Sequence, residues 1–395
     1  MPVPGCSLPY PRPADAAGFP ADSALWREDT VTTLDTYRLL GRSGLRVSPM
    51  ALGAMTFGTD WGWGSDAEES RRVFDTYVGA GGNFIDTASM YTNGSSEKLL
   101  GEFIGDRRDE LVIATKYSQS LRPTDPNAGG NNRKTMIASV ERSLRQLRTD
   151  YIDLFYLHYW DFTTPVQEVL RGMDDLVRAG KVRYLGISDI PAWEVSRMQT
   201  IAELRGWSPL IAMQVVYNLI ERDVEREFIP MAREMGLGIV PFSPLAYGVL
   251  AGKYTRADLG STTSADVAGT RKNVAAANGA LTERGLDIAD AVRRVAAEIG
   301  ATPAQVALAW TLTNPGVTSP IIGARTTDQL TDNLGALDVR LDAGQLRTLA
   351  EASAIEPGFP HNFLVNEMAN RTIYGQVSIE GITVQGSRAK ALTTP

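Results

Sequence analysis

Cysteine and histidine are both scarce in this sequence. Its 395 residues include one cysteine, Cys6, and two histidines, His158 and His361. A single cysteine excludes an internal disulfide and is typical of a protein kept in a reducing cytoplasm. Two histidines exclude a histidine-rich metal centre. We therefore expect no bound metal, although composition alone leaves a site built only from carboxylates open.

Long apolar runs and an excess of positive charge are also missing. No apolar run comes near the roughly 20 residues that span a bilayer, and residues 1–18 lack the basic start and apolar centre of a secretory signal. The net charge of -7 gives no reason to expect nucleic acid or an anionic membrane as a partner. With 43% hydrophobic and 22% charged residues, the chain is typical of a globular protein, which we expect in the cytoplasm. A homo-oligomer is compatible with this composition.

Both ends of the chain lack a regular pattern. Residues 1–36 are rich in proline and predict an irregular N-terminal extension. Residues 37–48 form two short runs around Gly41-Arg-Ser-Gly44, which predicts a β-hairpin. Residues 357–395 show weak periodicity, and we interpret them as a C-terminal extension.

Between the two ends, short apolar runs alternate with amphipathic segments. The runs predict eight strands, at residues 50–55, 84–85, 111–115, 152–157, 182–187, 211–216, 238–240 and 317–322. Eight strand–helix units of this kind predict a parallel sheet covered by helices. No G-x-G-x-x-G follows the first strand, so a closed (β/α)8 barrel over residues 37–356 is favoured over an open dinucleotide-binding sheet.

Local signals predict how helices begin and where the pattern is interrupted. Ser65 to Glu68, Thr164 to Gln167 and Thr302 to Gln305 each match a capping box, with Pro165 at a first helical position. Residues 250–284 are rich in Gly, Ala, Thr and Ser and predict a long loop after the seventh strand, of a size typical of lids and binding loops.

Polar residues follow the predicted strands. In a (β/α)8 barrel the carboxyl ends of the strands meet at one face, and active sites are built there. Each residue by itself has an ordinary structural explanation, but their repeated occurrence at successive strand ends favours a functional site. The residues read from these ends are Thr56, Asp86, Lys116, His158, Ser188, Asp189, Gln214, Phe242, Ser243, Gly323 and Arg325.

Four residues make chemical sense as one unit. The phenol of Tyr91 has an ordinary pKa near 10, which a neighbouring ammonium such as Lys116 would lower. Asp86 would hold that ammonium in place, and His158 would orient a carbonyl oxygen by a hydrogen bond. This unit predicts a proton donor aimed at a carbonyl group. Because no side chain can supply a hydride, a nicotinamide cofactor is implied.

Longer segments around these residues resemble the aldo-keto reductase superfamily. The resemblance extends over residues 37–360. It is carried by Gly82-Asn-Phe-Ile-Asp-Thr-Ala-Ser-Met-Tyr91, Ala114-Thr-Lys116, Asp150-Tyr-Ile-Asp-Leu-Phe-Tyr-Leu-His158, Gly186-Ile-Ser-Asp189, Val240-Pro-Phe-Ser-Pro-Leu245 and Ile321-Ile-Gly-Ala-Arg-Thr-Thr-Asp-Gln-Leu-Thr-Asp-Asn333. It implies a (β/α)8 barrel, NADP(H), and reversible reduction of an aldehyde or ketone to an alcohol. Gly130-Asn-Asn-Arg-Lys-Thr135 and His158-Tyr-Trp-Asp161 resemble the branch that contains aryl-alcohol dehydrogenases and fungal secondary-metabolite reductases.

The resemblance also implies residue roles. Tyr91 would be the general acid, tuned by Asp86 and Lys116, with His158 directing the carbonyl. The cofactor would be held by Thr56, by Ser188, Asp189 and Gln214 at the carboxamide, by Phe242 at the ring, by Ser243, Leu245, Gly248 and Lys253 at the pyrophosphate, and by Gly323, Arg325, Gln329 and Asn333 at the adenosine end. Many members have Asn where this chain has Asp189. A carboxylate can accept a hydrogen bond from the amide nitrogen but cannot donate to the carboxamide oxygen.

Large apolar side chains are expected at the mouth of the barrel. They could form a wall for a bulky, partly aromatic substrate, or they could be packing that seals the barrel top. These residues are Trp61, Trp63, Met90, Tyr159 and Trp160.

Two other functions are compatible with such a barrel. One is a non-catalytic nicotinamide-binding subunit, as in the potassium-channel β-subunits, although a pure binder does not need all four of the catalytic residues. The other is an isomerase or aldolase that uses Lys116 as a Schiff base. The absence of a recognisable phosphate-binding loop after the seventh strand argues against this second alternative.

Overall fold

The computed structural model describes residues 32–260, 270–364 and 367–375. Contacts divide the chain into two units, of which one comprises Thr32–Ile355 and the other includes the segment that begins at Glu356. The described part of the second unit contains two short helices, α12 (His361–Leu364) and α13 (Glu367–Tyr374). Residues 1–31 of the expected N-terminal extension, and residues 376–395 of the expected C-terminal one, lie outside the described residues.

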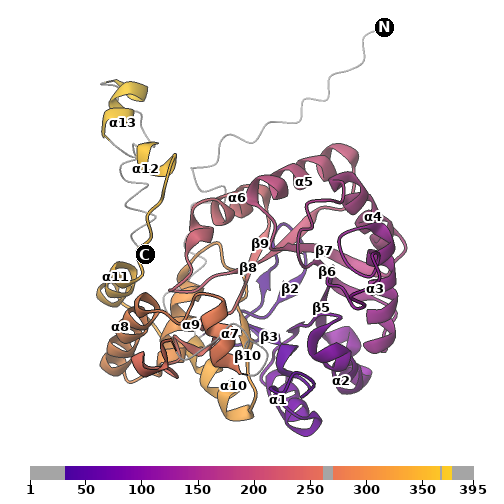
Figure 1. Ribbon diagram of the computed structural model, residues 1–395, viewed down its shortest axis with the longest axis horizontal. Coiled ribbons are helices and arrows are strands. Elements are labelled where there is room, and N and C mark those ends of the chain that lie inside the picture. Colours follow the sequence, from indigo (N-terminus) through magenta and orange to yellow (C-terminus); the bar gives the residue numbers. More distant parts are fainter. Residues whose placement is uncertain (1–31, 261–269, 365–366, 376–395) are drawn as a thin grey trace. The chain divides into compact units, whose positions relative to one another are not determined.

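An eight-stranded parallel sheet forms the centre of the first unit (Figure 1). Its strands follow the order β10-β3-β4-β5-β6-β7-β8-β9. Val317, before β10, pairs with Ile239 of β9, and the Thr318 N–H donates to the Ile239 carbonyl at 2.8 Å. The sheet therefore curls round until its two edges meet, and the predicted (β/α)8 barrel is confirmed. The strands are β3 (Ala51–Gly53), β4 (Phe84–Asp86), β5 (Val112–Tyr117), β6 (Ile152–Leu157), β7 (Val182–Ser188), β8 (Leu210–Val216), β9 (Gly238–Phe242) and β10 (Ile321–Gly323).

Helices surround the barrel on the outside (Figure 1). The strands read as apolar runs because they are covered on both faces, by helices outside and by the barrel interior inside. All residues of β5 are buried, for example. The outer helices are α1 (Ala67–Gly79), α2 (Ser95–Ile104), α3 (Arg133–Gln146), α4 (Val166–Arg178), α5 (Ala192–Arg205), α6 (Phe228–Met235), α8 (Glu283–Ile299), α9 (Pro303–Thr313), α10 (Thr327–Leu334) and α11 (Ala343–Ala352).

The predicted hairpin closes the amino-terminal end of the barrel. Strands β1 (Arg38–Leu39) and β2 (Arg46–Val47) pair in antiparallel fashion. Leu40, at the turn, is fully buried among inward-facing strand residues. Its neighbour Gly41 has φ +56°, and a Cβ there would lie 2.2 Å from the Ile211 carbonyl oxygen, so only glycine fits. The open end of the barrel is therefore the carboxyl end.

Only one of the three predicted capping boxes forms. Thr302 and Gln305 cap α9 reciprocally, as expected. The capping box predicted at Ser65 does not form, because Asp66 is the N-cap residue of α1. The Ser65 hydroxyl instead donates to the Arg325 carbonyl at 2.7 Å. The box at Thr164 is also wrong, because its hydroxyl donates to Asp161 at 2.7 Å and Pro165 is the N-cap residue, not the first helical one. A distant partner takes the Ser65 hydroxyl, and a carboxylate three residues earlier takes the Thr164 hydroxyl.

The long segment after β9 has more structure than its composition predicts. It contains the 3-10 turns η6 (Ala246–Gly248) and η7 (Arg256–Asp258) and the helix α7 (Arg271–Ala277), while residues 261–269 lie outside the described residues. Arg256 forms ion pairs with Asp287 at 2.5 Å and with Asp290 at 3.0 Å, both on α8. Before β9, the 3-10 turn η5 (Asp223–Glu225) precedes α6.

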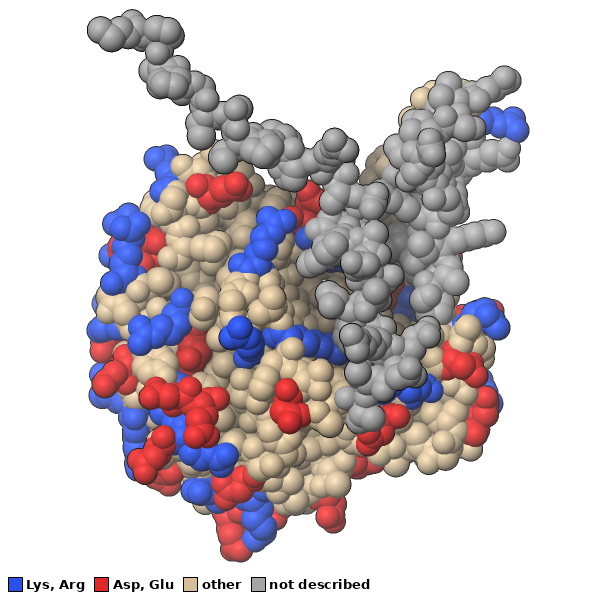
Figure 2. Space-filling model, turned by 180° about the vertical axis from the view of Figure 1, so that it is seen from behind, with Lys and Arg blue, Asp and Glu red and all other residues tan. Residues whose placement is uncertain are grey.

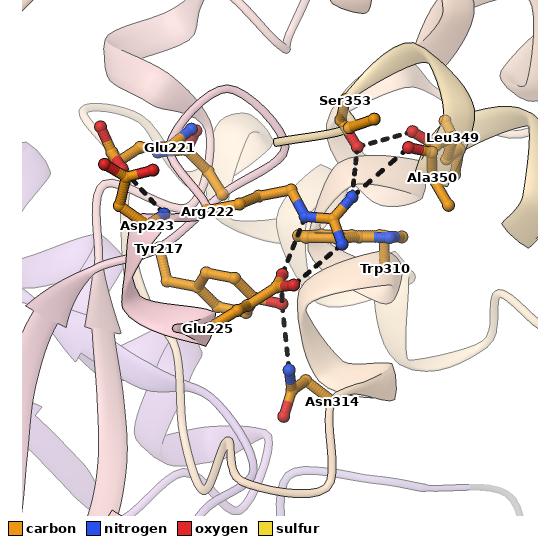
Figure 3. A network of polar contacts seen from close by, with 12 residues as sticks. Tyr217, Glu221, Arg222, Asp223, Glu225, Trp310, Asn314, Leu349, Ala350 and Ser353 are labelled. Carbon is orange, nitrogen blue, oxygen red and sulfur yellow. Dashed lines mark hydrogen bonds and ion pairs between the residues drawn. The ribbon is translucent and has the colours of Figure 1, made fainter. Parts of the chain in front are cut away.

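A buried polar network ties the loop after β8 to two outer helices (Figure 3). The Arg222 guanidinium donates to both carboxylate oxygens of Glu225, at 2.8 and 2.9 Å, and to the Ser353 hydroxyl at 2.8 Å. It lies 5.3 Å from the ring centre of Trp310 on α9. Glu225 also accepts a hydrogen bond from the Tyr217 hydroxyl at 2.8 Å. The network fixes the outer layer at the end of α11.

Charged side chains are mixed on the face seen in Figure 2. Lys and Arg are interspersed with Asp and Glu around its edge, and uncharged residues occupy much of its middle. No patch of one sign dominates the visible part of this face. Within the described ranges, no helix is both long enough and apolar enough to cross a bilayer.

Candidate active site

A cavity of about 490 Å³ lies at the carboxyl ends of the barrel strands. Nearly all the side chains selected from the sequence meet there. Those that line the cavity are Thr56, Trp61, Trp63, Asp86, Met90, Tyr91, His158, Tyr159, Ser188, Asp189, Gln214, Phe242, Ser243, Leu245, Gly248, Lys253, Gly323, Arg325 and Gln329. Lys116, Asn333 and Trp160 are not among the lining residues.

Lys116 stands behind the cavity wall and connects its neighbours. Its fully buried Nζ donates to Asp86 Oδ1 at 2.5 Å and to the Thr87 carbonyl at 2.8 Å, and lies 3.4 Å from the Tyr91 hydroxyl. Asp86 Oδ2 accepts a hydrogen bond from Gln214 Nε2 at 2.9 Å. These residues come from β5, β4, the turn after β4, and β8, so the closed barrel is what brings them together.

A strained turn presents Tyr91 to the cavity. Tyr91 begins the 3-10 turn η3 (Tyr91–Gly94), in which Thr92 and Asn93 have φ +46° and +53°. The Thr92 hydroxyl donates to the Phe57 carbonyl at 2.6 Å and accepts from the Ser96 N–H at 3.0 Å. Non-glycine residues in the left-handed region persist only where the surroundings hold them. The phenol is therefore pre-positioned at the site.

Burial dominates the ionisation of this group of residues. It raises the pKa of Asp86 and lowers the pKa of Lys116, and their ion pair opposes both shifts. The pKa of Tyr91 is raised well above 10 by burial, and the carboxylates of Asp86 and Asp189 add to the rise. Burial and these two carboxylates outweigh the lowering expected from the Lys116 ammonium, so the net shift of the Tyr91 pKa is upward. Tyr91 keeps its proton at neutral pH.

His158 faces Tyr91 from the end of β6. The two ring centres lie 5.9 Å apart with the rings nearly perpendicular, and the imidazole stacks on Tyr159 at 4.4 Å. Burial, together with the charge of Lys116, holds the pKa of His158 well below its ordinary 6.5. The imidazole is therefore neutral and can offer one donor and one acceptor nitrogen.

Among the described residues, three cavity-lining side chains have a buried polar atom without a hydrogen-bond partner: Gln119, Ser188 and Arg271. The Ser188 hydroxyl is shielded from solvent, and although it lies near the Asp189 carboxyl it completes no hydrogen bond with any described residue. Buried polar groups are nearly always paired in folded proteins, so an unpaired hydroxyl beside a cavity is suited to a ligand.

Three cations gather at another part of the cavity. Lys253, Arg271 and Arg325 all line it. Burial lowers the pKa of Lys253, and the nearby charges of Arg325 and Arg271 lower it further. Like charges held together in a cavity favour an anionic ligand.

Arg271, at the start of α7, is the main residue that sequence reasoning missed. Its guanidinium lies 5.2 Å from the Trp63 ring centre and 5.8 Å from that of Tyr247. Its Nη1 is shielded from solvent and has no hydrogen-bond partner among the described residues. A single arginine in a segment without periodicity carries no signal of such a position. The other lining residues not selected from the sequence include Gln119, Tyr247, Tyr254 and Asn278.

Two selected residues have other surroundings than expected. Trp160 packs against the main hydrophobic core, so its expected place in the substrate wall is corrected. Asn333, on α10, is buried and donates to the Gly323 carbonyl at 3.3 Å, which supports the loop after β10 without lining the cavity. No group of His, Cys, Asp and Glu suited to a metal ion occurs in the part of the chain that the structure describes.

A barrel with this site at its carboxyl end defines the chain as a (β/α)8 oxidoreductase. Residues 49–354 match the Aldo/keto reductase family, and the chain belongs to that family. It is 38% identical to an aryl-alcohol dehydrogenase [NADP(+)] of Phanerodontia chrysosporium, with 84% of this chain and 89% of the relative covered. It is 37% identical to norsolorinic acid reductase B of Aspergillus parasiticus, covering 85% and 88%. An uncharacterised oxidoreductase of Bacillus subtilis is also 37% identical, covering 79% and 94%. The family resemblance and the enzyme class expected from the sequence are confirmed.

Proposed function

We propose that this protein interconverts an aldehyde or ketone and the corresponding alcohol with NADP(H) as cofactor. The observation that carries the proposal is the Asp86–Lys116–Tyr91 arrangement, in which an ion-paired ammonium lies 3.4 Å from a phenol at the wall of a cavity. A positioned proton donor beside a neutral imidazole is suited to a carbonyl oxygen.

The cavity has the groups that a nicotinamide dinucleotide needs. The unpaired Ser188 hydroxyl is available to the carboxamide, with Asp189 and Gln214 beside it. At the basic part of the wall, Arg271 has an unpaired Nη1, and nothing lies within 4 Å of a Cβ placed at Gly323. When bound, the nicotinamide supplies the hydride, which no side chain can provide.

The cations favour NADP(H) over NAD(H). Lys253, Arg271 and Arg325 together offer more positive charge than a pyrophosphate requires, and an additional 2′-phosphate suits a guanidinium. The printed name of the Phanerodontia relative, which includes NADP(+), supports this preference. The remaining expected cofactor residues would contact the dinucleotide along the same wall: Thr56, Phe242, Ser243, Leu245, Gly248, Gly323 and Gln329.

Side chains of the protein would supply and stabilise the transfer of a proton to the carbonyl oxygen. Tyr91 holds its proton at neutral pH and would donate it to the carbonyl oxygen as that oxygen gains negative charge. Neutral His158 would hold the same oxygen by a hydrogen bond. Lys116 would stabilise the phenolate that Tyr91 leaves behind, and Asp86 would keep the ammonium in place.

The substrate that suits this cavity is bulky and partly aromatic. Trp61 lies 6.2 Å from the Tyr91 ring and 5.5 Å from Trp63, so an aromatic surface adjoins the proton donor. Met90 and Tyr159 extend it. The relatives' names, which refer to an aryl alcohol and to norsolorinic acid, are in keeping with such a substrate.

The alternatives fit less well. A Schiff-base mechanism needs a free amine in the cavity, whereas Lys116 is fully buried, is bonded to Asp86 and does not line the cavity. A non-catalytic subunit has no need of the strained turn that presents Tyr91.

The test follows nicotinamide absorbance with a panel of aldehydes, ketones and alcohols, for the wild type and for Tyr91→Phe. We expect turnover with aromatic substrates and a loss of kcat on the order of 10²–10⁴ in Tyr91→Phe, with cofactor binding retained. Unchanged turnover in Tyr91→Phe would refute the assigned acid. If the wild type binds neither NADPH nor NADH, the proposed function itself is wrong.

A further inference from the structure

Asp189 is a carboxylate without a counter-ion in the wall of the cavity. It directly follows β7, has φ +46°, and is accessible through the cavity. Within the described ranges, no lysine or arginine forms an ion pair with it, in contrast to Asp86 and its partner Lys116. Aspartate and asparagine tolerate the left-handed backbone better than other residues with a side chain, so the local geometry alone would accept either.

The charges around Asp189 leave its own charge largely uncompensated. The groups that interact with it electrostatically are Lys116 on β5, Tyr91 in η3, Tyr159 after β6 and Tyr247 in η6. The three tyrosines are neutral, because each has a pKa raised above its ordinary value, and the ammonium of Lys116 is already paired. Lys253, Arg271 and Arg325 interact electrostatically with one another, and none of them is among the groups that shift the pKa of Asp189. The cavity therefore has an acidic part beside Tyr91 and a separate basic part.

The geometry points to Asp189 as a residue that discriminates between the two redox states of the cofactor: its carboxylate binds the oxidised, cationic nicotinamide more tightly than the reduced, neutral one. This inference rests on the proposed function, which places the nicotinamide beside Ser188 and Gln214. It concerns the charge at position 189, whereas the hydrogen bonds to the carboxamide are available to both redox states.

The physical reason is the difference of one unit charge between the two rings. A single opposite charge within a few ångströms in a protein site changes an ionisation equilibrium by a factor of about 10 or more. The same interaction should favour oxidised over reduced cofactor by about tenfold relative to a neutral residue at this position. For a two-electron couple, a tenfold ratio is about 30 mV, in the direction that makes bound NADPH the stronger hydride donor.

This preference should depend on pH. Desolvation in the cavity wall raises the pKa of Asp189 to about 6, and the charge of Lys116 opposes that rise. Above that pH the carboxylate is charged and favours the oxidised cofactor; below it the carboxyl is neutral and the preference fades. By linkage, binding of NADP⁺ lowers the pKa of Asp189, so a proton is released when NADP⁺ binds near pH 6 and not when NADPH binds.

The experiment compares dissociation constants of NADP⁺ and NADPH for the wild type, Asp189→Asn and Ser188→Ala at about pH 8 and about pH 5. Quenching of Trp61 and Trp63, which line the cavity, reports binding without turnover. In Asp189→Asn at about pH 8, we expect NADP⁺ to bind about tenfold more weakly relative to NADPH. At about pH 5 the ratios of the two proteins should agree to within about twofold.

Ser188→Ala is the matched control, because it removes a neutral hydroxyl next to Asp189. It should weaken both redox forms by the same factor, since both carry the carboxamide. An unchanged NADP⁺-to-NADPH ratio in Asp189→Asn at about pH 8 would overturn the inference while leaving the proposed function intact. So would an equal change of that ratio in Ser188→Ala. Failure of the wild type to bind either form would instead refute the proposed function.

Discussion

Two buried ion pairs in this protein have similar chemistry and different surroundings. Lys116–Asp86 lies at the cavity next to a phenol, and the Ser188 hydroxyl in the same wall has no hydrogen-bond partner among the described residues. Arg222–Glu225 lies in the outer layer, where Ser353 and Tyr217 complete its hydrogen bonds. Buried charge alone therefore does not distinguish an active site. What distinguishes it is buried charge beside an accessible cavity and unpaired polar atoms.

The two pairs also differ in how the chain builds them. Arg222 and Glu225 are three residues apart in one turn. Lys116 and Asp86 come from neighbouring strands and meet only when β4 and β5 pair in register. The pair at the cavity thus depends on the barrel, while the pair in the outer layer supports it.

Replacing Lys116 by methionine should have the largest effect. The phenolate of Tyr91 would lose its neighbouring ammonium, and kcat should fall on the order of 10²–10⁴ while NADPH still binds. Steady-state kinetics with the best substrate of the panel, together with NADPH titration, measures both. A kcat within a few-fold of the wild type would contradict the assigned role.

Arg222→Met should break the other pair and leave the chemistry unchanged. Removing the cation leaves Glu225, whose side chain is 12% exposed, without its counter-charge, which should lower the free energy of unfolding by about 3 kcal/mol, the lower end of the range for buried pairs. Urea unfolding measures this loss, and kcat at a temperature where the variant is folded should match the wild type.

A matched control for Arg222→Met is Arg107→Met. Arg107 pairs with Glu110 at 3.3 Å, again three residues apart, but on the surface. Surface pairs contribute about 0–1 kcal/mol, so this variant should be nearly as stable as the wild type. Equal losses in the two variants would show that burial of the Arg222 pair is immaterial.

Glu97 is a third buried charged group, which has an oxygen without a hydrogen-bond partner among the described residues and does not line the active-site cavity. It is fully buried on α2, and its Oε1 accepts a hydrogen bond from Thr115 at 2.6 Å, while its Oε2 has no partner among the described residues. Burial raises the pKa of Glu97 from 4.5 to about 7. The folded state therefore binds a proton that the unfolded state has lost.

Glu97→Gln should consequently change the pH dependence of stability and not the chemistry. The folded pKa is raised, so the stabilisation from this group is fully present below pH 4.5 and is lost as pH rises through about 7. Relative to Glu97→Gln, the wild type should lose up to roughly 3 kcal/mol between about pH 5 and pH 8 in urea unfolding. A fall in kcat without this change in stability would contradict the interpretation.

The barrel and most of the candidate site could be predicted from the sequence. Strands covered on both faces leave apolar runs, and the barrel then fixes where their carboxyl ends meet, so Asp86, His158 and Gln214 could be brought together without coordinates. Arg271 could not, because its position depends on how a loop without periodicity folds. The capping boxes at Ser65 and Thr164 do not form because other acceptors bind these hydroxyls, the distant Arg325 carbonyl in one case and the nearby Asp161 carboxylate in the other.

The direction of the Tyr91 pKa shift could not be predicted from the sequence. The sequence indicates which charged residues lie near Tyr91, but not how strongly burial of the phenol outweighs the effect of those charges on its pKa. The structure places both Asp86 and Asp189 close enough to raise the pKa of the phenol and leaves Lys116 occupied by Asp86. The sign of a pKa shift in such a site depends on the balance between desolvation and Coulomb interactions, which only coordinates provide.

The hairpin at the amino-terminal end has a kinetic consequence. Because Leu40 and Gly41 fill that end of the barrel, cofactor and substrate share one entrance. Under the proposed function, the nicotinamide lies deeper, beside Gln214 and Ser188, and the substrate lies above it, against Trp61 and Tyr159. We would then expect the cofactor to enter before the substrate and to leave after the product, an order that follows from closure of the opposite end of the barrel by a short turn.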